Sequence, residues 1–155
     1  MGNNAMYKIY LTLILSTLMF QTQAEVLPKD SPERKQLIAM GYSLDKENPT
    51  DTWTIAKLGS TKIVFTKNSE RLAITRYFTR DKKLNSTEEL ELLKIINSWN
   101  KEYASQFFLD DESVVVSSYI YGDHDSRAFA LVVRMVDKID NVFDTQPRFY
   151  KLVNK

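Results

Sequence analysis

The residues best suited to binding a ligand lie close together in one segment and are Asn97, Trp99 and Asn100. Amide groups exchange hydrogen bonds with polar ligands, and an indole ring offers a large apolar surface with one N–H donor. The same residue types also form structural junctions, because Trp99 falls on an apolar helical stripe and asparagines can satisfy strand ends. The segment therefore indicates either a ligand patch or a junction between a helix and a sheet, and we favour the junction.

The single histidine, His124, lies between Asp123 and Asp125. Imidazole and carboxylate groups bind metals, but no second histidine exists to complete a site. We expect a polar loop in which Asp125 caps the next helix. The acidic run 110–112 lacks the spaced oxygen ligands of a calcium loop, so we expect a solvated hairpin turn there. The sequence therefore predicts no metal and no cofactor.

Motifs of the common catalytic classes are absent from the sequence. It has no G-x-S-x-G elbow, only four glycines for a phosphate-binding loop, and no cysteine for a thiolate nucleophile, a zinc site or a disulfide. The sequence does not decide whether two of the 20 acidic residues form a catalytic pair, because their separation in space is not visible in a sequence. We expect a protein that is not an enzyme, with a hydrolase that uses two carboxylates as the alternative.

The first 24 residues are typical of a secretory signal peptide. Lys8 precedes an apolar run at 9–20, and a polar stretch then ends in the small residue Ala24, after which we expect cleavage. The run of about 12 apolar residues is shorter than the roughly 20 that a membrane-spanning helix needs. Met6 is an alternative start. The sequence thus predicts an exported protein, periplasmic or secreted, whose folded part is residues 25–155.

The composition of the remaining chain fits one folded domain. Hydrophobic residues make up 43% and charged residues 26% of the full sequence, close to the averages for globular proteins. Removing 24 of 155 residues, among which Lys8 is the only charged one, leaves 131 residues with 20 Lys and Arg against 20 Asp and Glu. A nucleic-acid binder needs a basic face, so this balance disfavours nucleic acid as a partner.

Periodicity and capping residues predict an α+β fold. Asp30 or Ser31 is expected to cap a first helix that ends before Gly41, and Ser86 with Glu89 is expected to form a capping box for the central helix. Alternating apolar residues and turn signals predict strands in the remaining segments. The expected order is a first helix from 32, strands at 52–58, 61–66 and 72–79, a helix from 86, strands at 106–109 and 113–121, and a helix at 127–143. This α-β-β-β-α-β-β-α order predicts a single domain with an antiparallel sheet covered by helices, and leaves open whether 149–153 packs on it.

Particular residues add a resemblance to this order. They are Leu37, Gly41 and Tyr42 at the first helix exit, Tyr77 and Phe78 at a strand end, the segment 96–100 (INSWN), Phe107, Leu109, Asp110 and the strand 114–119. In this order they resemble the YbjN family over about 31–143. The resemblance implies a fold similar to that of type III secretion chaperones, which commonly form homodimers, and a role as a sensory transduction regulator. Many relatives lack a signal peptide, so a cytoplasmic regulatory role does not carry over to an exported chain.

We therefore expect a binding or chaperone-like module of the bacterial envelope that holds a partner protein or an unfolded segment. An extended peptide adding to an edge of a five-stranded sheet is one route, and pairing of two copies is another. Contact residues are expected among Tyr77, Tyr119 and Tyr121, because tyrosine combines an apolar body with a polar tip. Asn97, Trp99 and Asn100 are the other candidates. An inhibitor or immunity-type protein with one folded partner is a further alternative.

Overall fold

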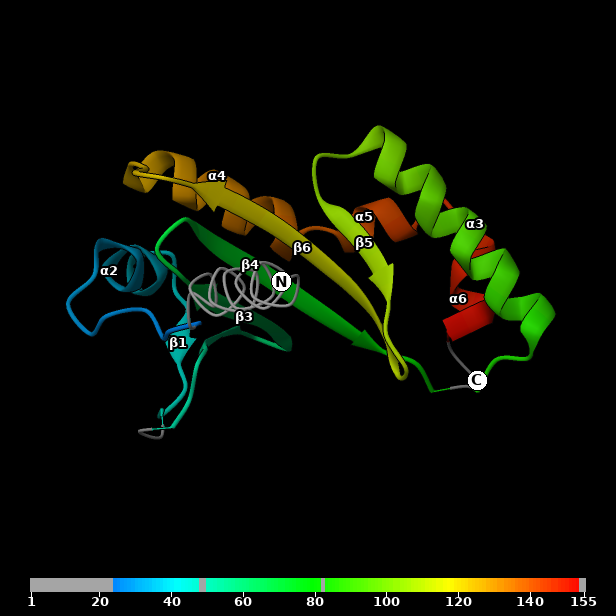
Figure 1. Ribbon diagram of the computed structural model, residues 1–155, viewed down its shortest axis with the longest axis horizontal. Helices are drawn as coiled ribbons and strands as arrows, with labels where there is room; N and C mark the ends of the chain where they lie inside the picture. The colour runs from blue at the N-terminus through cyan, green and yellow to red at the C-terminus, as the bar shows by residue number, and fades with distance from the viewer. Residues whose placement is uncertain (1–23, 48–49, 82, 154–155) are drawn as a thin grey trace, which may run out of the picture.

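The computed structural model describes residues 24–47, 50–81 and 83–153. The segment expected to be a signal peptide, apart from Ala24, lies outside the described residues. The elements, in chain order, are α2 (Pro32–Ala39), β1 (Ser43–Leu44), β2 (Thr54–Leu58), β3 (Thr61–Lys67), β4 (Arg71–Thr79), α3 (Ser86–Glu102), β5 (Gln106–Leu109), β6 (Ser113–Tyr121), α4 (Ser126–Asp137), α5 (Asp140–Phe143) and α6 (Pro147–Val153) (Figure 1). The α+β class and the antiparallel sheet are confirmed.

The sheet has six strands in the order β1-β2-β3-β4-β6-β5, and every pair is antiparallel. The prediction of five strands was wrong by one, because β1 is only two residues long and pairs Ser43 with Lys57 and Leu44 with Ala56. Two residues are too few for an alternating pattern to be recognised. The bounds of β5 and β6 agree with the prediction to the residue, and those of β2, β3 and β4 to within two residues.

The described helices pack on one face of the sheet, where they cover two hydrophobic clusters. Val114 and Val116 of β6 point to this face, while Val115 between them points to the other, as strand alternation requires. The first cluster lies under α2 and α4 and includes Leu37, Phe65 and Phe129. The second lies under α3, α5 and α6, and its largest side chains are those of Trp99, Phe107, Phe143 and Phe149. Figure 1 shows α2 and α3 at opposite ends of the molecule.

The helix caps agree with the prediction at two of three places. Ser31 caps α2 by accepting from the N–H of Arg34, and Asp125 caps α4. At the central helix the cap instead lies one residue earlier than predicted, at Asn85, with Glu88 as its partner. Asn85 has extended backbone angles, so its side chain can reach the N–H groups of the first turn, and asparagine is as good a cap as serine.

The long helix expected at 127–143 is broken. Its last turn is separate, because Lys138 leaves helical geometry and α5 begins only at Asp140. The break lets α4 face the first cluster through Val133 while Phe143 of α5 turns to the second. Pro147 then begins α6, since a proline at the first helical position loses no hydrogen bond.

Within the described part of the chain, none of the helices is both long enough and apolar enough to cross a lipid bilayer.

Candidate functional site

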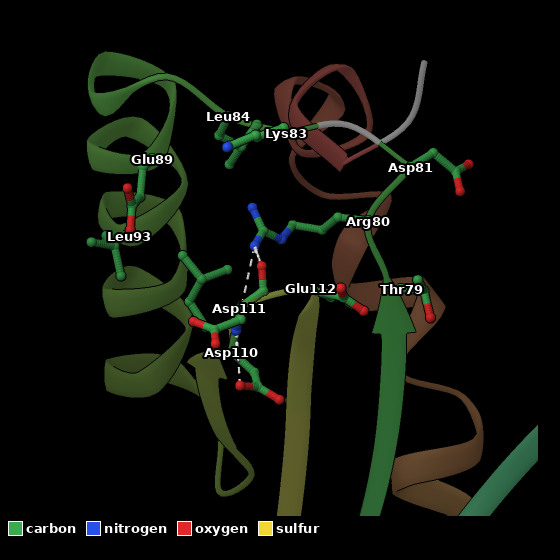
Figure 2. Close-up of a pocket in the computed structure, with 11 residues that line it drawn as sticks. Thr79, Arg80, Asp81, Lys83, Leu84, Glu89, Leu93, Asp110, Asp111 and Glu112 are labelled. Carbon is green, nitrogen blue, oxygen red and sulfur yellow. Dashed lines mark hydrogen bonds between the residues drawn. The ribbon is translucent and has the colours of Figure 1, made fainter.

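A cavity of about 820 Å³ lies at the end of the sheet where β4 stops and the turn between β5 and β6 begins. Its lining comes from the loop after β4, from the first half of α3 and from the acidic turn 110–112. Figure 2 shows the side chain of Arg80 extending between α3 and this turn. None of the six binding residues proposed from the sequence lines this cavity.

Arg80 is held by the turn it faces. One terminal guanidinium nitrogen, Nη2, donates to the carbonyl oxygens of Asp110, at 3.2 Å, and of Asp111. The main-chain N–H of Arg80 donates to the carbonyl of Glu112 at 2.8 Å, which continues the strand pairing by one step. The guanidinium nitrogen Nε is buried without a partner. These bonds give Arg80 a structural role, which is to fix the β5–β6 turn against the end of β4.

The charged residues that line the cavity do not indicate a particular class of ligand. Its lining contains five acidic residues against Arg80 and Lys83, so anionic ligands meet a net negative charge. The carboxylate of Asp110 already accepts the N–H of Asp111 at 2.8 Å. Among the described residues, no group of three or more His, Cys, Asp and Glu side chains is placed to hold a metal ion. The run 110–112 is a turn, as the sequence predicts.

Trp99 belongs to the core. It is 1% exposed, and its ring centroid lies 5.1 to 5.3 Å from those of Phe107, Phe143 and Phe149. Its indole N–H has no hydrogen-bond partner. The tryptophan therefore joins the second cluster, which is the structural role that we favoured, and its ring is not accessible to a ligand.

Asn100 completes the backbone pairing of an edge strand. Its side-chain oxygen accepts the N–H of Phe107 at 2.7 Å, and its amide nitrogen donates to the carbonyl of the same residue at 2.8 Å. Both groups of Phe107 point away from β6, because β5 forms the edge of the sheet. Asn97, one turn earlier on α3, is exposed. The two asparagines therefore differ in their surroundings. Of the two, Asn100 has a defined role in the fold.

The three tyrosines lie on the sheet face opposite the described helices. Tyr77 of β4 and Phe108 of β5 both pair with Val115, so the two rings flank one position of the central strand β6. Tyr77 is 52% exposed, Phe108 44% and Tyr121, further along β6, 65%. Tyr119 is half-buried, with the guanidinium of Arg71 at 4.7 Å from its ring centre. This aromatic face is defined by Tyr77, Phe108, Tyr119 and Tyr121.

Phe108 was missed by the sequence analysis, although a signal for it exists. In the strand 106–109, Phe107 points into the core, so its neighbour must point to the other face.

His124 is part of a second arrangement that the sequence did not predict. Its Nε2 lies 3.4 Å from a carboxylate oxygen of Glu33, and its Nδ1 lies 3.4 Å from the carbonyl oxygen of Gly122. Both ring nitrogens therefore lie near oxygen atoms of the protein. A general base needs one nitrogen free to accept a proton, so this geometry does not support a role for His124 in activating Ser126 nearby.

Glu33 is the buried carboxylate among the described residues. Burial alone raises its pKa, but bonds from its own backbone N–H, from Lys67 and from Ser31 outweigh burial and hold the pKa below the ordinary value. A general acid of a glycosidase type needs the opposite shift. The arrangement therefore gives no support to a two-carboxylate hydrolase at this position.

A scan of protein-family models and a search of curated proteins found no match to this chain. The resemblance to the YbjN family therefore stays a prediction.

Proposed function

We propose that this protein is a non-enzymatic, chaperone-like binding module of the bacterial envelope, acting after loss of residues 1–24, and that it holds extended apolar segments of other exported chains. The observation that carries the proposal is the exposed aromatic face. Tyr77 and Phe108 flank Val115 across three adjacent strands, and Tyr121 extends the same face along β6. Tyrosine and phenylalanine give large contact areas at low entropic cost, and they are enriched at protein interfaces.

The edges of the sheet are less suited to the same task. At β5, the outward N–H and C=O of Phe107 are already bonded to Asn100. At the other edge, β1 has only two residues. An added strand would gain few main-chain hydrogen bonds at either edge. The aromatic face is therefore the surface that we assign to partner binding.

The first test measures binding of a permanently unfolded, fluorescently labelled model protein. Every residue of the two core clusters lies after residue 24, so the chain from Glu25 onward has a complete core and is the form to use. The double variant Tyr77→Ser/Phe108→Ser is expected to weaken binding by roughly thirtyfold or more, since both residues are central to the face. Leu90→Ser is the matched control, because Leu90 is 54% exposed but lies on α3.

Tyr119→Asp, on the same face, is also expected to abolish partner binding without unfolding the domain. The half-buried position of Tyr119 against Arg71 makes it the less clean test. If the double variant binds as tightly as the parent chain while keeping its unfolding midpoint, the assignment of the aromatic face is wrong.

A second test separates a chaperone-like module from an inhibitor or immunity-type protein. A photo-crosslinking residue at position 77 is introduced in cells, and the trapped proteins are identified against the same residue at position 90. Recovery of a varied set of exported chains supports the proposal. Recovery of one folded protein alone favours the inhibitor, and self-crosslinks alone contradict a chaperone role.

A further inference from the structure

The outward side of α4 carries an unusual combination of exposed residues. Leu131 is 60% exposed and Met135 41%, and the two are one helical turn apart. Arg127, Arg134 and Lys138 are also exposed. At 100° per residue, all five point away from Phe129 and Val133, which α4 buries in the core. The outward side of α4, defined by these five residues, therefore carries two apolar side chains among three cationic ones, with a cation at each end.

The carboxylates of Asp125 and Asp137, near the two ends of α4, are bonded to neutral groups of the fold. The carboxylate of Asp125 accepts the N–H of Ala128 at 2.7 Å as the helix cap. The carboxylate of Asp137 is bonded to the buried hydroxyl of Tyr42, whose pKa is raised by burial first and by Asp137 second. Both acids are thus engaged in the fold.

Helix stability explains the cations at the C-terminal end of α4 but not Arg127. Arg134 and Lys138 suit the C-terminal end of a helix, where positive charge is favourable. Arg127, by contrast, lies in the first turn of α4, where the helix dipole disfavours a cation. Exposure of Leu131 and Met135 likewise contributes nothing to the core. Arg127, Leu131 and Met135 are therefore left without a role in the fold.

We propose that the outward side of α4 rests on an anionic lipid bilayer and gives the protein reversible attachment to a membrane surface. Cationic side chains bind anionic headgroups, while their aliphatic stems and the two apolar side chains enter the boundary of the acyl region. The outward side of α4 has long, flexible side chains and lacks the aromatic anchors that dominate protein interfaces. It is also convex, and a lipid bilayer can bind it without a surface of matching shape. This favours lipid over an acidic protein.

The attachment leaves the aromatic face free. Helix α4 packs on the helix-covered face of the sheet, and its outward side points away from the sheet altogether. A protein held to a membrane through α4 can therefore present Tyr77 and Phe108 to other chains. The inference does not depend on the proposed function, because it rests on other residues.

The experiment is co-sedimentation of the chain from Glu25 onward with vesicles of phosphatidylglycerol and phosphatidylethanolamine, compared with vesicles of phosphatidylcholine. We expect association with the anionic vesicles alone, weakening as salt rises. Arg127→Gln/Arg134→Gln is expected to lower the partition coefficient roughly 25-fold, at roughly fivefold for each lost cation. Leu131→Ser/Met135→Ser is expected to lower it roughly tenfold. Leu90→Ser again serves as the control.

The unfolding midpoint of each variant is measured in urea, so that loss of binding is not confused with loss of fold. The proposal is overturned if the parent chain does not sediment with anionic vesicles, if it binds neutral vesicles equally well, or if the α4 variants bind like the control.

Discussion

At the scale of single residues, Glu33 joins three parts of the molecule. It lies in the first turn of α2, accepts from Lys67 of β3 at 3.2 Å, and faces His124, before α4, at 3.4 Å. Its side chain is 4% exposed, and its second carboxylate oxygen has no partner. Hydrogen bonds and the charge of Lys67 thus stabilise the ionised carboxylate against the effect of burial. The pKa of Glu33 in the folded protein is therefore lowered.

The pH dependence of stability follows from this shift. A carboxyl whose folded pKa lies below its ordinary value of 4.5 stabilises the protein above that value, and the stabilisation is lost as pH falls through the folded pKa. We predict that Glu33→Gln lowers the free energy of unfolding by about 1–3 kcal/mol at pH 7. The difference from the parent chain is expected to shrink as the solution is acidified to pH ~3.

Urea unfolding of both chains across this pH range measures the difference directly. Glu89→Gln, at an exposed position, controls for the general loss of a negative charge. A difference for Glu33→Gln that stays constant from pH 7 to pH ~3 would show that the charge of Glu33 is not its cause.

At the scale of elements, the position of the edge strand β5 depends on α3. Asn100 bonds both free backbone groups of Phe107, and the side chain of Phe107 packs on Trp99. The helix therefore supplies to β5 the hydrogen bonds that a seventh strand would otherwise supply. The segment INSWN is in this sense a joint between α3 and the sheet.

We predict that Asn100→Ala lowers the free energy of unfolding by about 1–3 kcal/mol, because two backbone groups of Phe107 lose their partners. Asn97→Ala, on the exposed side of the same helix, is expected to change it by less than about 0.5 kcal/mol. Amide hydrogen exchange at Phe107 should rise in the first variant and stay unchanged in the second. Equal effects of the two substitutions would contradict the role of Asn100.

At the scale of the whole molecule, two hydrophobic clusters share one sheet. Strand β4 contributes Leu72 and Ile74 to the first cluster and Phe78 to the second, and β6 pairs with β4 along its full length. Loss of either cluster exposes the same central strands. We therefore expect both clusters to unfold in one cooperative transition.

The two tryptophans allow this prediction to be tested. Trp53 is exposed, so Trp53→Phe leaves the buried Trp99 as the sole reporter of the second cluster. In that background, Leu37→Ala in the first cluster is expected to lower stability by about 2–5 kcal/mol. The unfolding midpoints from Trp99 fluorescence and from circular dichroism should fall together. Separate midpoints would show that the clusters unfold independently.

Local sequence accounts for most of the elements and for two of the three predicted caps. Strand alternation places β5 and β6 to the residue, and Ser31 and Asp125 act as caps because a cap is decided by residues three positions away. The cap of α3 was predicted at Ser86 and lies at Asn85, so local sequence does not decide between these two neighbours. Neighbouring asparagine and serine are chemically equivalent caps, and the backbone conformation chooses between them.

The features that matter for function depend on contacts between segments far apart in the chain. Periodicity predicts which side of α4 is buried, but not that Arg127, Leu131 and Met135 stay uncovered by other elements. Likewise, no local pattern brings Glu33 to His124 or closes a cavity around Arg80. Helical and strand repeats are properties of a few consecutive residues, whereas exposure and pairing depend on how the sheet and helices pack together.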